Sequence, residues 1–362
     1  MEDLMTSTAL KVERAISSRI GEVDFNNLQF GRLFSDHMFE MVFENGTWGE
    51  ASIKPFQTIE TTPALNALHY GQAVFEGMKA FYVDEETINI FRPDVHFARF
   101  NNSCRRMCIP ETDYETFIAA LEELLRLDKA WVPKDHGTAL YLRPVIFASD
   151  NYLAARVSDI YNYYIVTSPV GAYYPEGFNP VSLTTPDGYV RAVKGGTGEA
   201  KTAGNYAASF LPAKKAQEEG YTQVLWLDAI ENKYIEEVGT MNIHFLINDT
   251  LVTPELTGSV LAGVTRHSVT ELAKEWGYRV EERRISIDEV FEASQNGSLK
   301  EVFGSGTAAV ISPVGLIHHD GTTINIGNGQ IGDVAKRLFD EITGIQYGDI
   351  ADRYGWVHSV KV

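Results

Sequence analysis

Hydrophobic and polar positions alternate in the first part of the chain in a pattern that predicts β-hairpins. Phe39, Met41 and Phe43 alternate with other residues up to Asn45-Gly46, and Thr47-Trp48 follows. Asn-Gly readily takes the positive φ angles that a type I′ turn requires, so a hairpin is expected here. The run AFYVDEETINIFRP repeats the pattern, with the acidic residues 84–86 at its tip.

A change to helical spacing follows these hairpins. The stretch HFARFNNSCRRMCI places apolar residues three and four positions apart, which predicts a helix. Thr112-x-x-Glu115 reads as a capping box ahead of FIAALEELLRL, whose apolar stripe ends before Pro133. The first part of the chain is therefore a mixture of helices and strands.

Two strand-like runs, ALYLRPVIFA and YNYYIVTS, lead into the segment GAYYPEGFNP, which is rich in Gly, Pro and Tyr. Such a composition is typical of an interdomain connector, so we expect a domain over 1–170, a connector over 171–181 and a second domain over 182–362. The second half predicts strands, a hairpin that turns at Asn248-Asp249, and three helices. The expected strands are 222–226 and 234–236, and the expected hairpin spans 243–253. The expected helices are 264–276, 286–294 with a Ser286-x-x-Glu289 capping box, and 332–342 stopped by Thr343-Gly344.

Composition indicates a globular chain. Of 362 residues 44% are hydrophobic, and no uninterrupted apolar run is long enough to span a bilayer. The formal charge of −18 disfavours nucleic acid and anionic membranes as partners. The start MEDLMTSTALKVERA resembles neither a secretory signal nor a transit peptide, so a cytoplasmic protein is expected.

Cysteine usage adds little chemistry. Cys104 and Cys108 are the two cysteines, which gives no disulfide framework and no four-ligand metal site. In a helix their spacing would place both thiols on one face, and packing inward is the expected role.

The run GGTGEAKTAGNY holds the most informative residue, Lys201. Gly195-x-x-x-x-Ala200-Lys201-Thr202 differs from a P-loop at one place, and VLWLD, ending at Asp228, imitates a Walker B strand. Alanine before the lysine would strain the turn that wraps a phosphate. The flanking segments also read as antiparallel hairpins rather than a parallel βαβ unit, so we consider the nucleotide interpretation weak.

The competing interpretation is that Lys201 carries pyridoxal phosphate as a Schiff base. Glu237, in EVGTMN, could keep the pyridine nitrogen protonated, so that the ring acts as an electron sink. A helix opening at Gly263-Val264-Thr265, the turn GSGTAA and the charge of Arg99 could hold the phosphate.

One strand suggests the substrate. Tyr141 and Arg143 are two residues apart in YLR, so both point to one face of a strand. Arg143 offers bidentate recognition of a carboxylate. Aromatic residues elsewhere could wall an apolar pocket, although by themselves they are more typical of a core. They are Phe30, Tyr70, Phe75 and Tyr173.

From about Phe30 to its end the chain resembles the branched-chain amino acid aminotransferases, which are pyridoxal phosphate enzymes of fold type IV. The matching stretches are FGRLFSDHMF, YGQAVFEGMKAF, FRPDVHFARFNNSCRRM, YLRPVIFASD, KGGTGEAKTAGNY, EEVGTMN, LAGVTRHSV and VFGSGTA. The resemblance implies a mixed α+β, two-domain fold with a smaller N-terminal domain and a larger, strand-rich C-terminal pseudo-barrel. It also implies reversible transamination of leucine, isoleucine and valine with 2-oxoglutarate.

The resemblance further implies a role for each candidate residue. Lys201 would be the Schiff-base lysine, Glu237 would pair with the pyridine nitrogen and Tyr206 would bond the phenolic oxygen. The phosphate would be held by Arg99, Val264, Thr265 and Thr307. The substrate would be contacted by Phe30, Tyr70, Phe75, Tyr141, Arg143, Tyr173, Thr240, Thr307 and Ala308. Tyr70 and a loop around Leu153 would approach the site of a neighbouring subunit, which implies a homodimer.

Two departures from the family pattern are informative. Some members have a redox-active Cys-x-x-Cys just after GSGTA, where this chain has Ala309 and Ser312. Ala200 replaces a tyrosine that often precedes the lysine. Other fold type IV enzymes, such as D-amino acid aminotransferases, remain the alternative, as does a protein that keeps the fold without turnover.

Overall fold

The computed structural model describes residues 10–171 and 177–362. Contacts divide the chain into two compact units, unit 1 with residues 1–172 and 346–362 and unit 2 with residues 173–345. The expected connector falls at the boundary, but residues 172–176 of it lie outside the described residues. We expected the second domain to extend to residue 362, but residues 346–362 belong to unit 1. Unit 1 is therefore not the smaller of the two.

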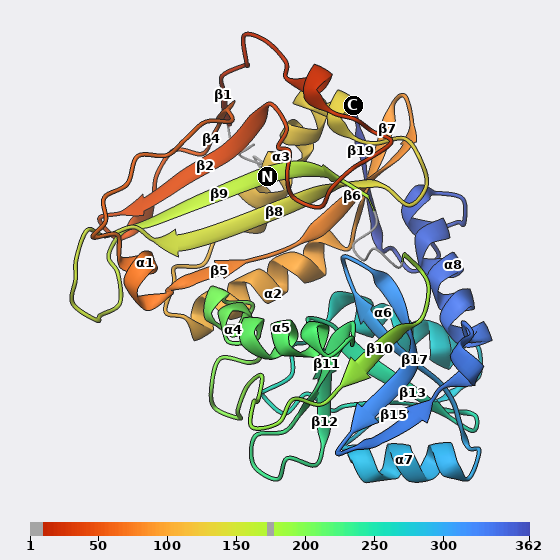
Figure 1. Cartoon of the computed structure of the whole chain (residues 1–362). Coiled ribbons are helices and arrows are strands. Elements are labelled where there is room, and N and C mark those ends of the chain that lie inside the picture. Colours follow the sequence, from red (N-terminus) through yellow and green to blue (C-terminus); the bar gives the residue numbers. More distant parts are fainter. Residues whose placement is uncertain (1–9, 172–176) are drawn as a thin grey trace, which may run out of the picture. The chain divides into compact units, whose positions relative to one another are not determined.

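A ten-stranded sheet forms the body of unit 1, in the order β1-β4-β2-β9-β8-β6-β7-β19, with β3 on β2 and β5 on β8 (Figure 1). Its last strand explains the shifted boundary, because β19 pairs antiparallel with β7 over 87–91. The strands are β1 Lys11–Val12, β2 His37–Glu44, β3 Thr47–Trp48, β4 Ser52–Pro55, β5 Ala73–Phe75, β6 Met78–Asp84, β7 Thr87–Phe91, β8 Ala139–Ala148, β9 Tyr161–Val170 and β19 Val357–Lys361. The helices are η1 Ile20–Glu22, α1 Asn66–Tyr70, α2 Pro93–Arg106, α3 Tyr114–Leu127 and η2 Lys129–Trp131.

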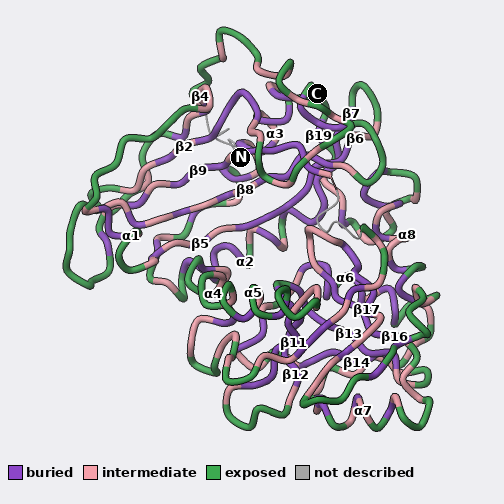
Figure 2. Tube along the Cα trace, viewed as in Figure 1, coloured by how far each residue is buried: buried purple, intermediate pink, exposed green. Residues whose placement is uncertain are grey.

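Helices α2 and α3 cover one face of this sheet. Phe100 of α2 and Leu121 of α3 belong to one fully buried cluster with Leu140 and Leu142 of β8. The central strands β8 and β9 are buried along most of their length (Figure 2). Side chains alternate along a strand, so Tyr141 and Arg143 project from the opposite face, away from the helices.

Local signals predicted much of unit 1. Both hairpins are confirmed, and Asn45 and Gly46 take the expected positive φ values of 54° and 81°. The Thr112 capping box is wrong by one residue, because Asp113 is the N-cap of α3 and accepts from Thr116 N–H at 2.7 Å.

The two cysteines do not share a helix face. Cys104 is fully buried in α2, and burial raises the pKa of its thiol. The helix ends at Arg106, and Cys108 is exposed with a φ of 55°. The expectation that both pack inward is therefore wrong for Cys108.

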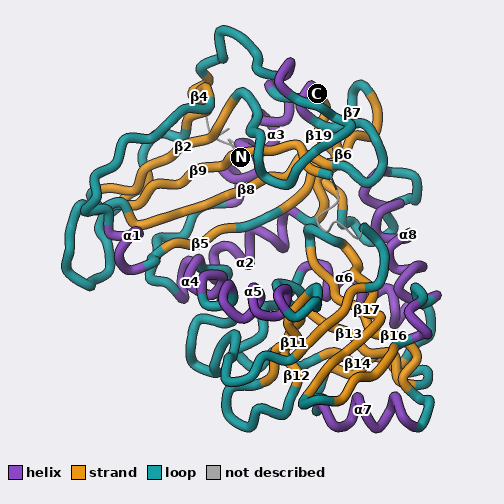
Figure 3. Tube along the Cα trace, viewed as in Figure 1, coloured by secondary structure: helices purple, strands orange, loops and turns teal. Residues whose placement is uncertain are grey.

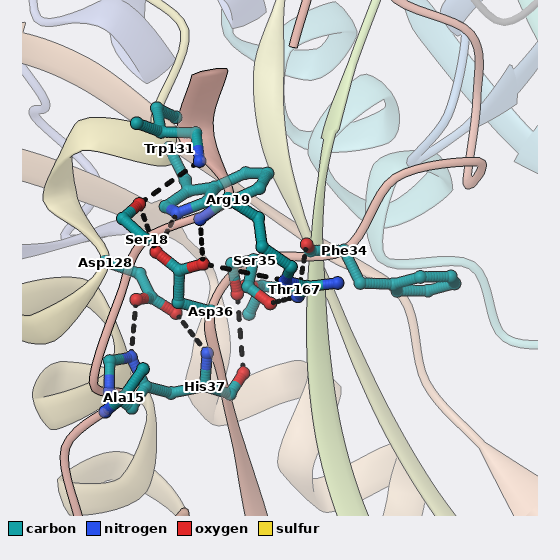
Figure 4. Close-up of polar contacts among 11 residues, drawn as sticks. Ala15, Ser18, Arg19, Phe34, Ser35, Asp36, His37, Asp128, Trp131 and Thr167 are labelled. Carbon is teal, nitrogen blue, oxygen red and sulfur yellow. Dashed lines mark hydrogen bonds and ion pairs between the residues drawn. The ribbon is translucent and has the colours of Figure 1, made fainter. Parts of the chain in front are cut away.

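A polar network fastens the N-terminal segment to unit 1 (Figure 4). The Asp36 carboxylate accepts from the Ser18 hydroxyl at 2.5 Å, from Arg19 N–H at 2.8 Å and from Trp131 Nε1 at 2.8 Å. Burial acts against ionisation, but these donors outweigh it and lower the pKa of Asp36. Beside it, His37 Nδ1 lies 2.6 Å from Asp128 Oδ1.

Unit 2 is built on a nine-stranded sheet in the order β12-β11-β10-β17-β16-β13-β14-β15, with β18 on β17. Its strands are β10 Val181–Thr184, β11 Gln223–Leu227, β12 Ile235–Val238, β13 Asn242–Ile247, β14 Thr250–Thr253, β15 Arg279–Glu282, β16 Leu299–Gly306, β17 Val310–His319 and β18 Thr322–Asn325. Its helices are α4 Ala203–Ala207, α5 Phe210–Glu218, α6 Val264–Glu275, α7 Ile287–Gln295, η3 Gly327–Gly329 and α8 Asp333–Tyr347, whose last two residues belong to unit 1. Helix and strand bounds can be followed in Figure 3.

Two expectations for unit 2 are confirmed and one is wrong. The hairpin that turns at Asn248 is present, and the Ser286 hydroxyl caps α7 by accepting from Glu289 N–H at 3.1 Å. The predicted stop of the last helix at Thr343-Gly344 is wrong. Helix α8 continues to Tyr347 because Ile342 and Ile345, on either side of the glycine, are both buried.

No helix among the described residues is long and apolar enough to cross a membrane. No group of His, Cys, Asp and Glu side chains in residues 10–171 and 177–362 is arranged to hold a metal ion.

Candidate active site

Lys201 lies at the end of the long loop that joins β10 to α4 (Figure 3). Its Nζ donates to the Tyr206 hydroxyl at 2.7 Å, because the short helix α4 begins at Ala203 and brings Tyr206 back over the lysine. The amine is only partly buried, and Ala200 before it is 2% exposed. A partly buried amine held by a phenol is suited to bond formation with a small carbonyl compound.

The strands on either side of this loop pair differently from the sequence-based expectation. We expected antiparallel flanks, but β10 and β11 are parallel, so the loop, α4 and α5 connect two parallel strands. Asp228 still does not serve as a Walker B residue. Its carboxylate accepts backbone N–H groups from Ile230, Glu231, Lys233 and Tyr234, so its oxygens close the β11–β12 turn.

Glu237 is a buried carboxylate on β12, with 3% of its surface exposed. Its Oε2 lies 3.1 Å from Arg191 Nε, and its Oε1 accepts from Leu261 N–H at 2.7 Å. Burial raises the pKa of Glu237, while Arg191 and then the Leu261 N–H group oppose that rise. Arg191 is itself held by the carbonyls of Gly198 and Ser259. Sequence reasoning missed Arg191, because nothing in its local sequence marks it as a partner of Glu237.

Unit 2 brings several candidate residues together. One shallow cleft is lined by Tyr206, Glu237 and Thr240, together with Arg191 and Leu261. Its volume is about 20 Å³, so it is a small open depression and not a closed pocket.

Helix α6 begins three residues after Leu261, which donates to Glu237. Val264 and Thr265 form its first turn and are buried. A side chain at Gly263 would meet the Asn242 Oδ1 atom at 1.9 Å, so only glycine fits at this N-cap. The first N–H groups of a helix favour an anion, which makes this turn a candidate phosphate site.

Thr307 and Ala308 occupy the turn between β16 and β17. Ser305, two residues before Thr307, pairs with Asn242, and a side chain at Gly304 or Gly306 would contact Met241. The turn therefore starts close to the EVGTMN segment.

In unit 1, Tyr141 and Arg143 lie together on β8. Arg143 Nη2 donates to the Tyr141 hydroxyl at 3.2 Å, which confirms that the two side chains share a face of β8. The guanidinium lies 4.8 Å from the Phe75 ring centroid, and Phe30 packs edge-on against Tyr141 at 4.9 Å. A side chain at Gly77 would overlap the Tyr141 hydroxyl, so glycine is required beside it.

The surroundings of the Arg143 guanidinium are aromatic, and in the described part of the chain they offer it no carboxylate. Its Nε is buried without a hydrogen-bond partner, and no ion pair joins it to a carboxylate in the described part of the chain. Aromatic rings stabilise a guanidinium without neutralising it. The arrangement suits an external carboxylate.

Arg99 is arranged differently. Its Nε lies 2.7 Å from Glu76 Oε1 and its Nη2 lies 2.9 Å from Glu76 Oε2, and His96 Nδ1 lies 2.8 Å from the same carboxylate. Glu76 is fully buried. The sequence indicated Arg99 but not this carboxylate, because Glu76 and Arg99 lie on different elements.

The last two expected substrate-contacting residues are Tyr70 and Tyr173. Tyr70 is 43% exposed at the end of α1 and donates to the carbonyl of Leu153, itself 62% exposed, so the two present one surface of unit 1. Tyr173 lies outside the described residues.

The fold and the lysine, phenol and buried carboxylate of unit 2 together define a class of enzyme. The sequence profile of the amino-transferase class IV family matches residues 73–317, and the chain belongs to this family.

Within that class the chain belongs with the branched-chain-amino-acid aminotransferases. It is 49% identical to branched-chain-amino-acid aminotransferase 2 of Bacillus subtilis, over 98% of each chain. It is 51% identical to branched-chain-amino-acid transaminase 1 of the same organism, over 93% of this chain and 95% of that protein. The crystal structure of the T.th. branched-chain amino acid aminotransferase with pyridoxamine 5′-phosphate is similar at a TM-score of 0.71 and 28% identity, over 88% of this chain and 97% of that one.

Proposed function

We propose that the enzyme transfers the amino group of L-leucine, L-isoleucine and L-valine to 2-oxoglutarate, giving branched-chain 2-oxo acids and L-glutamate. The observation that carries the proposal is the arrangement of Lys201, Tyr206 and Glu237 in one unit, with the Lys201 amine bonded to the phenol and Glu237 buried beside Arg191. The similar crystal structure holds pyridoxamine 5′-phosphate, which supports pyridoxal phosphate as the cofactor here.

The residues present fit this cofactor. Glu237 is buried and has one hydrogen-bonded N–H donor and one arginine contact, so it can accept from a protonated ring nitrogen. Tyr206 can donate to a phenolic oxygen, while the first turn of α6, Thr307 and Arg99 are the proposed phosphate ligands. When bound, the cofactor supplies an electron sink that acidifies the substrate α-proton.

The proposed roles of the chain's own groups follow. Lys201 would take the proton from Cα of the amino acid and deliver it to the C4′ carbon of the cofactor, on the other side of the amino nitrogen, and the Tyr206 hydroxyl orients the amine. Glu237 stays ionised against the ring nitrogen. In unit 1 the rings of Phe30, Phe75 and Tyr141 contact an aliphatic side chain.

The remaining proposed contacts bind the carboxylate groups of the substrates and complete the side-chain pocket. Arg143 binds the γ-carboxylate of glutamate, and Thr307 and Ala308 bind the α-carboxylate. Thr240 and Tyr173 complete the side-chain contacts. We further propose that the enzyme is a cytoplasmic homodimer, in which the exposed Tyr70–Leu153 surface faces the second subunit.

A spectral titration tests the function. We expect the visible absorbance of the purified enzyme to change with L-leucine and with L-glutamate but not with D-leucine or D-alanine. The Lys201→Ala variant should lose turnover by about 10⁴-fold or more, whereas Lys214→Ala, at a surface lysine that pairs with Glu218, should retain it. A response to D-alanine would instead support a D-amino acid aminotransferase, and full activity of Lys201→Ala would refute the proposal.

A further inference from the structure

Unit 2 contains a second cavity that shares no lining residue with the cleft at Glu237. It has a volume of about 300 Å³ and lies between the β11–β12 turn, the loop after β14, and residues 193–194. Glu236 is in its wall. Because successive residues of a strand point to opposite faces, Glu236 and Glu237 of β12 face different sites.

Glu236 is a buried carboxylate that lacks a cation. It is 8% exposed, its Oε1 accepts from the Ser259 hydroxyl, and its Oε2 is buried without a hydrogen-bond partner in the described part of the chain. Two arginines are near, but both are engaged. Arg191 pairs with Glu237, and Arg284 pairs with Glu231 at 2.7 Å while its guanidinium lies 3.4 Å from the Tyr234 ring centroid.

A buried carboxylate oxygen without a donor is costly unless something binds it. Asp228, in the same wall, does not compete for a cationic ligand, because its oxygens are occupied by backbone N–H groups. Glu231 and Glu255 also line the cavity, but Glu231 is exposed and pairs with Arg284, and Glu255 is only partly buried. A ligand that brings an ammonium group would therefore find its buried partner at Glu236.

The rest of the cavity lining specifies the other end of such a ligand. Val193, Ile230, Ile235 and Val260 provide apolar wall. Lys194 also lines the cavity, is exposed, and makes no hydrogen bond or ion pair within the described residues. The volume of about 300 Å³ is at the small end of ligand sites, which suits a small molecule such as an amino acid.

We propose that this cavity binds a free α-amino acid with a short aliphatic side chain, with its ammonium group at Glu236, its carboxylate at Lys194 and its side chain against the apolar wall. The proposal goes beyond transamination, because the amino acid bound here is not a substrate. It does not depend on Lys201.

A chain of contacts links this cavity to the candidate active site. The Glu236 carboxylate accepts a hydrogen bond from the Ser259 hydroxyl, and the Ser259 carbonyl accepts one from Arg191. Arg191 in turn forms an ion pair with Glu237. An amino acid at Glu236 is thus placed to act on the carboxylate that the transamination proposal uses, as an effector would.

The test uses the Lys201→Ala protein, which cannot turn the probe over. Binding is assigned to this cavity by changes at Glu236 and Lys194, because Lys201→Ala leaves the proposed substrate contacts of the active site in place. The probe is α-methylleucine, which has the ammonium, carboxylate and side chain of leucine but no α-proton to transfer. Calorimetric titration should show binding at this cavity in addition to any binding at the active site. Adding Glu236→Gln should weaken binding at least tenfold, and adding Lys194→Ala should weaken it severalfold.

Two comparisons make the result decisive. Glu292→Gln removes the same charge at an exposed position of α7 outside the cavity and should leave the affinity unchanged. Isopentylamine and 4-methylvaleric acid lack the carboxylate and the ammonium group respectively. Each should bind at least tenfold more weakly than the probe at the site that Glu236→Gln weakens. Absence of binding in the Lys201→Ala background would overturn the proposal.

Equal affinity in the Glu236→Gln and unsubstituted proteins would also overturn it. If Glu236→Gln lowers the melting temperature, Lys194→Ala decides, because Lys194 is exposed and its replacement leaves no buried group unpaired. Failure of the transamination proposal would appear in the spectral titration and would leave this binding result unaffected.

Discussion

Each unit contains one buried glutamate that contacts an arginine, and the two pairs differ in how completely the carboxylate is satisfied. In unit 1, Glu76 receives two guanidinium contacts from Arg99, at 2.7 and 2.9 Å, and a third from His96 at 2.8 Å. In unit 2, Glu237 receives one contact from Arg191 at 3.1 Å and one backbone N–H group.

The difference reverses the effect of burial on the two carboxyl groups. Burial acts to raise both pKa values. At Glu76 the charges and hydrogen bonds of Arg99 and His96 outweigh burial, so its pKa is well below the usual range. At Glu237 burial outweighs Arg191 and the Leu261 N–H group, so the pKa is raised. A complete donor set marks a structural pair, whereas an incomplete set leaves a carboxylate that another donor can complete.

The largest expected effect comes from removing the Glu76 carboxylate, which pairs with Arg99 and His96. Glu76→Gln leaves Arg99 and His96 buried without their carboxylate, so the free energy of unfolding should fall by about 3–5 kcal/mol. Urea denaturation measures this. Glu44→Gln, at the exposed end of β2, removes the same charge and should change stability by less than about 0.5 kcal/mol. A loss below about 1 kcal/mol at Glu76 would mean that the pair is not structural.

The second prediction concerns the incomplete pair. Glu237→Gln keeps an oxygen for the Leu261 N–H group but loses the charge, so kcat/KM for L-leucine should fall about 100-fold or more. Stability should change by less than about 1 kcal/mol, since the charge was poorly compensated. Glu219→Gln, on an exposed residue after α5, provides the matched control. Unchanged activity would remove Glu237 from catalysis.

A third arginine sharpens the comparison, because Arg143 has aromatic rings around it and no carboxylate within ion-pair distance in the described part of the chain. Arg143→Ala should raise KM for L-glutamate about tenfold, as expected for the loss of a charged hydrogen bond, and change KM for L-leucine by less than about twofold. Steady-state kinetics with both substrates measure this, and Arg105→Ala, at an exposed arginine, is the control. Equal losses for both substrates would show that Arg143 does not select the acidic one.

The sequence predicted those parts of this picture that depend on neighbours along the chain. Asn45-Gly46 and Ser286 act within a few residues, so local pattern was sufficient. The roles of Lys201 and Glu237 came from the chemistry that a cofactor lysine needs and from the resemblance.

Features that depend on distant contacts were missed. Glu76 and Arg99 meet because β5 and α2 pack together, and β19 joins β7 across more than 250 residues, with no local signal in either case. The parallel pairing of β10 and β11 was missed for the same reason. Burial of Ile345 carried α8 through a glycine that the local rule treats as a stop.

The smallest expected effect is a difference in sign between the two glutamates when stability is measured against pH. A carboxyl group with a lowered folded pKa, such as Glu76, contributes stability that is present above the unfolded value of about 4.3 and is lost as pH falls. Glu237, with a raised folded pKa, binds its proton more tightly in the folded state. It therefore lowers stability as pH rises from about 4.3 through its folded pKa.

Chemical denaturation of cofactor-free protein across this pH range distinguishes the two behaviours. Glu76→Gln should remove a rise in unfolding free energy with pH, whereas Glu237→Gln should remove a fall. Cofactor-free protein is used because a ring nitrogen bound at Glu237 would supply the missing donor and cancel the fall. If both variants alter the pH dependence in the same direction, the two pairs are equivalent and the contrast drawn from their donor sets is wrong.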